Sequence, residues 1–285
     1  MPPERVRRRC VNLPPLASPD LVRYVIGHTR TGLRPGAMTR PAAALAARHA
    51  LALAGAIAAI AACKSSPQSS DSSTTPAVAS TTSAPDTMWR TLFDGTSMAA
   101  FRGYKMDTMP SGWRIADGTL TKDASVEDIV TRDQFGNFEL ELDWKLSPSG
   151  NAGIFYRANE KNAKVYMSGP EYQLLDDARH PDGKSRLTSA AADYGLYPSP
   201  AGIVKPANEW NATRIVARGS HVEHWLNGQK VVEYELGSPD WETKVKASKF
   251  NDWKDYGQEK VGHVAIQGDH TGALAIRNVR IRVLP

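Results

Sequence analysis

The segment Phe138-Glu139-Leu140-Glu141-Leu142-Asp143-Trp144-Lys145-Leu146 decides the fold class. Its apolar and charged residues alternate without exception, so they separate into one apolar face and one charged face. Only the period of two of a β-strand produces this separation, because a helix of the same sequence would mix both kinds on every side. The segment therefore predicts a strand of an antiparallel sheet with one face against a core and the other toward water.

Further short segments with turn residues between them extend this prediction to the rest of the chain. The strand candidates are residues 210–218, 221–226, 230–236, 261–267 and 273–284. We expect the last two to form a pair across a hairpin turn at 268–272. One helix is expected near 239–250, with Ser238 as the N-cap and Pro239 in its first turn. The pattern predicts an all-β fold, an antiparallel β-sandwich or jelly roll with one short helix.

The charge of the chain is distributed unevenly along its length. The whole sequence has 35 basic and 30 acidic residues, a net charge of +5. Residues 1–62 contain nine arginines and two acids, so the remainder of the chain carries a net charge of −2. A nearly neutral body does not attract a polyanion, and we therefore expect no nucleic-acid partner.

The N-terminal segment has the features of a bacterial lipoprotein leader. A basic stretch at 38–49 precedes an apolar run at 50–62, which is too short to span a bilayer comfortably. The sequence IAAC at 60–63 resembles a lipobox, and this resemblance implies cleavage before Cys63 and a lipid on its sulfur. We expect 38–62 to be the lipoprotein signal peptide, with a plain secretory signal or a buried hydrophobic helix as the alternatives. Residues 1–37 fit no part of a leader and are interpreted as a disordered upstream extension from a misplaced start codon.

Residues 63–87 are expected to tether the lipidated Cys63 to a single folded domain at 88–285. The tether is rich in Ser, Thr and Pro and has too little apolar surface to fold. Cys10 and Cys63 are the only cysteines, so the domain has neither a disulfide nor a thiolate metal site. The expected location is the bacterial cell envelope, and Lys64 after the lipidated cysteine favours the outer membrane over the inner one. No protein partner is indicated.

The first candidate site is the charged face of the strand at 138–146. Glu139, Glu141 and Asp143 follow one another at about 7 Å, from the rise of a strand, a spacing at which two carboxylates can act as acid and base of a glycoside hydrolase. The alternative is an ordinary solvated face of an antiparallel sheet.

The second candidate site combines residues of two expected strands. Glu171 and Gln173 share one face of the first strand, and Phe155 and Arg157 share one face of the second. A carboxylate, an amide and a guanidinium beside aromatic rings suit a polyhydroxylated ligand. The alternative is a structural ion pair between Glu171 and Arg157.

A long segment at 177–207 follows the second candidate site. It has little periodicity and contains several polar residues, namely His180, Asp182, Arg186, Asp193 and Tyr194. A loop of this length in a compact domain is usually functional, so we expect it to cover the binding site.

The third candidate site is the turn Gln267-Gly268-Asp269-His270. An imidazole next to a carboxylate can act as a general base or a metal ligand, although an aspartate–histidine pair in a turn often serves the turn alone. His221 and His224 are expected on an exposed hairpin and outside any site. The sequence has no glycine-rich phosphate loop, so no organic cofactor is expected.

Several motifs of the domain together resemble the 3-keto-disaccharide hydrolase domain family. They are WRTLFDGT at 89–96, AGIFYR at 152–157, EYQLLD at 171–176, EWN at 209–211, HWLNG at 224–228, GHVAIQGDH at 262–270 and IRNVRI at 276–281. The resemblance covers essentially all of 88–285 in order. It implies a concanavalin- or laminin-G-like sandwich that acts on glycosides already oxidised to a ketone at C3 of the sugar.

A 3-keto group acidifies the proton on C2, so the implied reaction is C2 deprotonation, β-elimination of the C1 substituent and hydration of the resulting glycal. This chemistry needs a base, an electrophile at the ketone oxygen and an acid for the leaving group. His270 or Glu171 is the expected base. The expected substrate-binding residues are Phe155, Arg157, Gln173, Asp176, Tyr194, Gln267 and Asp269. Of these, Asp176 or Asp269 orients the base or helps to hold a divalent metal ion, whose ligand set the sequence leaves unknown.

Two other functions remain open from the sequence. The first is a non-catalytic, lectin-like carbohydrate-binding module, because a sandwich of this type also serves as a lectin. The second is an ordinary glycoside hydrolase that uses Glu139, Glu141 and Asp143. The substrate of the favoured function is an oxidised sugar, and the lipid on Cys63 provides the membrane contact.

Overall fold

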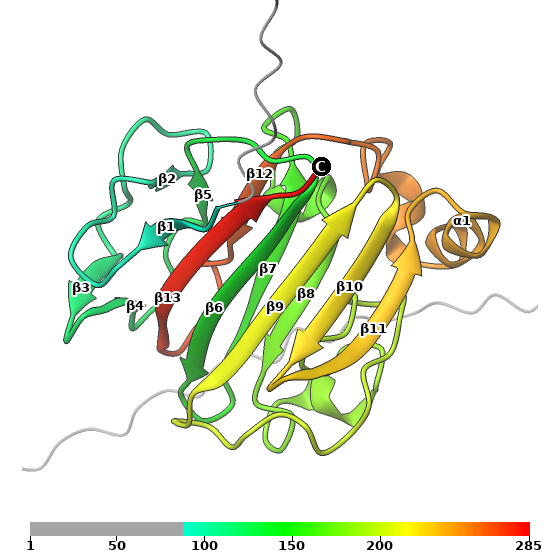
Figure 1. Ribbon diagram of the computed structural model, residues 1–285. Coiled ribbons are helices and arrows are strands. Elements are labelled where there is room, and N and C mark those ends of the chain that lie inside the picture. The colour runs from blue at the N-terminus through cyan, green and yellow to red at the C-terminus, as the bar shows by residue number, and fades with distance from the viewer. Residues whose placement is uncertain (1–87) are drawn as a thin grey trace, which may run out of the picture. The chain divides into compact units, whose positions relative to one another are not determined.

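The computed structural model describes residues 88–285, which form two antiparallel sheets packed face to face (Figure 1). The expected extension, signal peptide, tether and lipidation at Cys63 lie outside these residues and remain predictions. Within the described part of the chain, no helix has the length and the apolar character needed to cross a bilayer.

The larger sheet has eight strands. Its order is β11 (Gln229–Glu235), β10 (His221–Leu226), β9 (Asn211–Arg218), β6 (Phe138–Leu146), β13 (Leu274–Val283), β4 (Thr119–Lys122) and β3 (Arg114–Ala116), and β1 (Arg90–Phe93) pairs with β13. The smaller sheet has the order β2 (Phe101–Gly103), β5 (Ile129–Thr131), β12 (His263–Ile266), β7 (Asn151–Ala158) and β8 (Glu171–Leu175). The all-β sandwich is therefore confirmed.

One α-helix, α1 (Pro239–Lys246), and three short 3-10 helices complete the part of the chain that the structure describes. The 3-10 helices are η1 (Val165–Met167), η2 (Pro181–Lys184) and η3 (Lys249–Asp252). The Ser238 hydroxyl caps α1 as expected, accepting a hydrogen bond from the Trp241 amide at 3.2 Å. The helix is shorter than expected, because it ends at Lys246 and the chain continues into η3.

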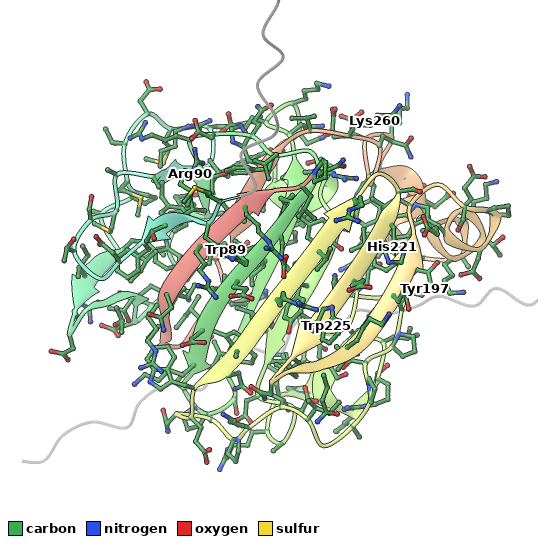
Figure 2. The ribbon with its side chains drawn as sticks, viewed as in Figure 1. Trp89, Arg90, Tyr197, His221, Trp225 and Lys260 are labelled. Atoms are coloured by element: carbon green, nitrogen blue, oxygen red, sulfur yellow. The ribbon has the colours of Figure 1, made fainter. Side chains whose placement is uncertain are left out.

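The strand at 138–146 is β6, in the middle of the larger sheet, and its alternation is observed as predicted. Leu140 and Leu142 are buried in the core, whereas Glu141 and Asp143 lie on the outer face. Arg280 and Arg277 of the neighbouring strand β13 pair with these two carboxylates. Figure 2 looks onto this outer face and labels Trp89 and Trp225.

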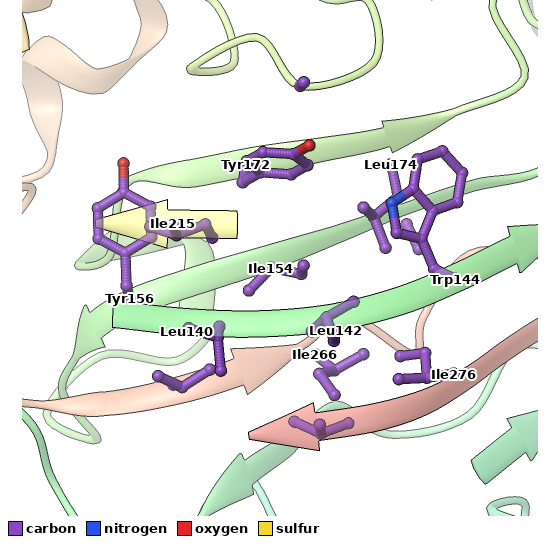
Figure 3. Packing of buried hydrophobic residues seen from close by; sticks show 14 of the residues in the cluster. Leu140, Leu142, Trp144, Ile154, Tyr156, Tyr172, Leu174, Ile215, Ile266 and Ile276 are labelled. Carbon is purple, nitrogen blue, oxygen red and sulfur yellow. The ribbon is translucent and has the colours of Figure 1, made fainter. Parts of the chain in front are cut away.

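The core between the sheets is built from the inward residues of both (Figure 3). Trp144 of β6, Ile154 of β7 and Tyr172 of β8 are each at most 1% exposed. His224 also belongs to this interior, with its Nδ1 3.0 Å from the Ala191 carbonyl and its Nε2 3.0 Å from the Tyr156 hydroxyl. The expectation of an exposed His224 is wrong, because strand alternation turns it inward between the outward residues Glu223 and Trp225.

The expected hairpin between the last two strands is also wrong. β12 belongs to the smaller sheet and β13 to the larger one, so residues 267–273 cross from one sheet to the other. Both segments are strands as predicted, but each finds its partners elsewhere. The crossing places the loop that contains Asp269 and His270 at an end of the sandwich and not in a simple turn.

We expect Leu140→Ala to lower the free energy of unfolding by about 2–5 kcal/mol, because it leaves a cavity between the sheets. The matched change Glu141→Ala on the same strand removes one partner of an outer-face ion pair and should cost about 1 kcal/mol or less. Urea unfolding of both variants measures the difference. Equal losses would contradict the observed in–out alternation of β6.

Candidate active site

The candidate site lies on the outer face of the smaller sheet, and Tyr172 fixes this orientation. Its hydroxyl donates to the Trp225 carbonyl at 3.1 Å and accepts from Thr213 Oγ1 at 2.9 Å, and both of those partners belong to the larger sheet. The Tyr172 side chain therefore points inward across the core. Because successive side chains of a strand alternate, its neighbours Glu171 and Gln173 point outward.

A pocket of about 280 Å³ opens where these two side chains emerge. Six of the predicted residues line it together, namely Glu171, Gln173, Tyr194, Gln267, Asp269 and His270. Glu171 and Gln173 of the second candidate site therefore share one pocket with the third candidate site. Asp182 and Tyr194 bring the segment 177–207 to its wall, as expected of a loop beside the site.

The carboxyl group of Glu171 is held tightly at the floor of the pocket. A Cβ atom on Gly153 of the neighbouring strand would lie 2.3 Å from Glu171 Oε1, so a side chain at position 153 would displace the carboxyl group from this position. With its amide in the swapped orientation, the Gln173 nitrogen donates to Glu171 Oε1 at 3.0 Å and to the Ala152 carbonyl at 3.2 Å. Burial raises the pKa of Glu171 to about 8, opposed in part by the nearby charge of Lys249.

His270 reaches the pocket from the loop that crosses between the sheets. Lys122 anchors this loop, because its buried Nζ donates to the carbonyls of His270 at 2.7 Å and Gly272 at 3.1 Å. The Gly268 amide donates to Asp128 Oδ1 at 2.8 Å. Burial lowers the pKa of the His270 imidazole below its usual 6.5, so the imidazole is neutral at pH 7.

Two polar atoms of the pocket are buried without a hydrogen-bond partner among the described residues. They are Gln267 Oε1 and Asp269 Oδ1. A buried acceptor without a partner costs free energy and is uncommon in folded proteins. Hydroxyl groups of a bound sugar would supply the donors that these two acceptors need.

Five further residues line the pocket that were not predicted as site residues from the sequence: Asn151, Tyr166, Asp182, Lys249 and Phe250. Lys249 matters most, because it brings a cation to the pocket with its Nζ 4.4 Å from the centre of the Tyr194 ring. Lys249 lies in the segment at 239–250 that is predicted as a helix, and the sequence therefore did not indicate it as a pocket residue. Ser248 is the residue that indicates the end of the helix. Its hydroxyl accepts a hydrogen bond from the Phe250 amide at 3.1 Å and caps the start of η3.

Three predicted substrate-binding residues lie outside the pocket. Phe155 packs beneath it in a small cluster with Val165 and Tyr166. Asp176 accepts a hydrogen bond from the Ser149 amide at 2.8 Å and pairs with Arg179 at 3.3 Å.

Arg157 is the third, and a β-bulge turns it away. The register of β7 against β12 shifts next to Arg157, whose φ is 52°. Its guanidinium group and Nε donate to the Gly219 and Gly136 carbonyls at 2.7 and 3.0 Å. With these partners Arg157 does not form the expected alternative ion pair with Glu171.

The arrangement of possible metal ligands differs between the pocket and the larger sheet. Over residues 88–285, three histidine or carboxylate ligand atoms come within reach of one ion only at His221, Glu223 and Glu233, on the larger sheet. The carboxylates and the imidazole of the pocket are not gathered in this way. The divalent ion therefore stays a prediction for experiment.

The charged row of β6 has a structural explanation. Arg282, Arg280 and Arg277 of β13 pair with Glu139, Glu141 and Asp143, respectively. An arginine therefore occupies each carboxylate of the row, whereas a glycosidase pair needs carboxyl groups that exchange protons with the substrate. The row is therefore a poor candidate for acid–base catalysis.

Comparison with known proteins shows the family of this domain. A family model described as a 3-keto-alpha-glucoside-1,2-lyase-like domain matches residues 88–282. A protein of Bacteroides thetaiotaomicron named 3-keto-disaccharide hydrolase is 35% identical over 226 residues, covering 68% of this chain and 78% of that protein.

Two crystal structures of Parabacteroides distasonis proteins labelled as glycosyl hydrolases share the fold. The first has a TM-score of 0.65 and 30% identity, covering 69% of this chain and 94% of the other. The second has a TM-score of 0.58 and 29% identity, covering 69% of this chain and 100% of the other.

We expect Lys122→Met to loosen the loop at 268–272, because the carbonyls that Lys122 binds would lose their donor. Amide hydrogen exchange should become faster in this loop, and the free energy of unfolding should fall by about 1–3 kcal/mol. Lys145→Met, on the outer face of β6, is the matched control and should leave the loop unchanged. Exchange at 268–272 that is the same in both variants would contradict the anchoring role.

Proposed function

Because the chain belongs to the family of 3-keto-α-glucoside-1,2-lyase-like domains, we propose that it cleaves the glycosidic bond of 3-keto-glycosides by elimination and hydration. One observation supports this reaction above all others. A single pocket contains a neutral imidazole, a protonated carboxyl group and an ammonium group, from His270, Glu171 and Lys249. These are the base, the acid and the electrostatic partner of the ketone oxygen that the reaction needs.

The reaction begins at C2 of the oxidised sugar. Removal of the C2 proton leaves an enolate, whose negative charge lies on the oxygen at C3. The enolate electrons then form the C1–C2 double bond and expel the aglycone oxygen, which takes up a proton. Addition of water across this double bond gives the free 3-keto-sugar, so the overall change is hydrolysis.

His270 is the base in this proposal. Its imidazole is neutral at pH 7 and can accept the C2 proton at once, whereas Glu171 holds its own proton up to about pH 8. Glu171 is therefore assigned as the acid that protonates the leaving oxygen. Of the two bases that the sequence leaves open, the proposal therefore takes His270.

Lys249 and five further residues of the pocket complete the proposed set of catalytic and binding residues. The Lys249 ammonium stabilises the charge that develops on the oxygen at C3. Gln173, Gln267 and Asp269 bind the sugar hydroxyls, and the Tyr194 and Phe250 rings pack on its C–H faces.

Anchoring at the cell envelope is a further part of the proposal and rests on the sequence of the leader. A lipid on Cys63 would hold the domain at the membrane through the segment 64–87. An oxidising enzyme of the same organism must supply the 3-keto substrate.

The purified full chain should release the aglycone from a chromogenic 3-keto-glucoside and leave the unoxidised glucoside intact. Glu171→Gln and His270→Ala should each lower kcat by about 100-fold or more, because each removes one proton-transfer group. Glu139→Gln makes the same chemical change on the opposite face and should keep full turnover. The absorbance of the released aglycone measures the turnover of the unchanged protein and of the three variants.

The same assay separates the remaining alternatives. Release from the unoxidised glucoside, lost in Glu139→Gln, would establish the ordinary glycosidase. Binding of either glucoside without release would favour the lectin-like module. Loss of activity in EDTA, restored by a divalent metal, would assign a metal to the reaction, and unchanged activity would remove it.

The pH profile tests which residue is the base. With His270 as base and Glu171 as acid, kcat falls below the lowered pKa of His270, where the imidazole is protonated, and falls again above about pH 8, where Glu171 loses its proton. Glu171→Gln should lose the alkaline decline while keeping the acidic one. A kcat that instead rises through pH 8 would make Glu171 the base.

A further inference from the structure

A second hollow lies on the outer face of the larger sheet, on the side of the sandwich opposite the pocket. Its volume is about 920 Å³, within the range of ligand sites, and it shares no lining residue with the pocket. Its walls come from β1, β6, β9, β10 and β13. Glu141, Arg214, Trp225 and Arg280 present side chains there. The proposed reaction leaves this hollow without a role.

Backbone irregularities coincide with the hollow. The register of β13 against β6 shifts between Arg277 and Arg280, with Asn278 at a φ of 55°. The register of β1 against β13 shifts between Thr91 and Phe93. Bulges bend a strand and redirect its side chains, and they are frequent beside functional sites. Asn278, Thr91 and Phe93 all line the hollow, so the bent backbone forms part of its wall.

The Trp225 ring lies at one side of the hollow, where two contacts fix its orientation. Figure 2 labels it on the outer face of the larger sheet. Its indole nitrogen donates to Glu223 Oε2 at 2.7 Å. The Arg214 guanidinium lies 3.9 Å from the centre of its ring, which fixes the plane of the indole. The side chain stays half-buried. An aromatic ring fixed before binding loses little entropy when a ligand stacks on it.

Glu141, Asp143, Arg214 and Arg280 of the hollow each have an ion-pair partner, Arg280 and Glu141 with each other and Asp143 and Arg214 with residues beside the hollow. Arg280 lies 2.6 Å from Glu141, and Asp143 lies 3.2 Å from Arg277. Paired groups of opposite sign leave little net field, so neither a polyanion nor a polycation is favoured. The same groups offer both donors and acceptors at fixed positions. Hydroxyl groups, which donate and accept, match such a surface better than charged groups do.

We propose that this hollow is a second carbohydrate-binding site, which takes a neutral oligosaccharide. A sugar ring stacks on Trp225, and its hydroxyls bond to Arg214, Glu141 and Arg280. None of these contacts requires a ketone at C3, so the site binds unoxidised sugar. The site would hold the domain on a glycan while the pocket on the other face acts on smaller oxidised glycosides.

Calorimetric titration of the purified full chain with cellohexaose and with maltohexaose tests the proposal. We expect at least one of these neutral oligosaccharides to bind, and Trp225→Ala to weaken its binding at least tenfold. Trp210→Ala is the matched control, because Trp210 lies on the same sheet and also packs against an arginine, Arg277, but does not line the hollow. Glu171→Gln should bind as the unchanged protein does, which separates this site from the pocket.

Three results would overturn the proposal. In the first, neither oligosaccharide binds at millimolar concentration. In the second, Glu171→Gln weakens binding as much as Trp225→Ala does, which would place the sugar in the pocket. In the third, sedimentation shows a dimer that Trp225→Ala dissociates, which would make the hollow an interface between copies. Arg280→Ala replaces Trp225→Ala if the latter does not fold.

Discussion

The hydrogen bonds of the Tyr172 hydroxyl across the core are the constraint on which both faces of this domain depend. They tie β8 of the smaller sheet to Thr213 and to the backbone of Trp225 in the larger one. On one side they direct Glu171 outward into the pocket. On the other side they fix the strand whose Trp225 ring faces the second hollow. One buried hydroxyl therefore positions residues of both candidate sites.

The electrostatics of the pocket follow from burial more than from ion pairing. Burial raises the pKa values of Glu171 and of Asp128, which lies behind the loop at 268–272, to about 8 and about 6. It raises the pKa of Asp193 as well, whose carboxyl oxygens are buried without a partner among the described residues. These groups carry less negative charge near pH 7 than exposed carboxylates would. They therefore offset less of the positive charge of Lys249, which can stabilise an enolate.

The sequence predicts the direction of a side chain where it depends on regular strand alternation. It does not predict the direction where the alternation is interrupted. The alternation of β6 and the shared face of Glu171 and Gln173 follow from a period of two. The predicted position of Arg157 is wrong because a bulge adds one residue to β7. A single sequence gives no reliable signal for a bulge.

Pairing between distant segments limited the prediction in two further places. The segment at 268–272 reads as a hairpin turn, but the partners of β12 and β13 lie far away in the sequence. Lys249 enters the pocket only because α1 stops at Lys246, and the signal for that stop, Ser248, is a single residue. Local patterns therefore identified the strands, while long-range contacts decided which of their residues meet.

The two faces of the sandwich show why carboxylates of one chain have different chemistry. On the larger sheet, Glu141 lies against Arg280 at an open surface, with the two charged groups 2.6 Å apart. On the smaller sheet, Glu171 is enclosed beside an amide, and burial favours its protonated form. A carboxyl group that is protonated at neutral pH can supply a proton to a leaving group, which is the role proposed for Glu171. The acidic row that is most conspicuous in the sequence therefore suits a binding surface, whereas the single enclosed carboxyl group suits catalysis.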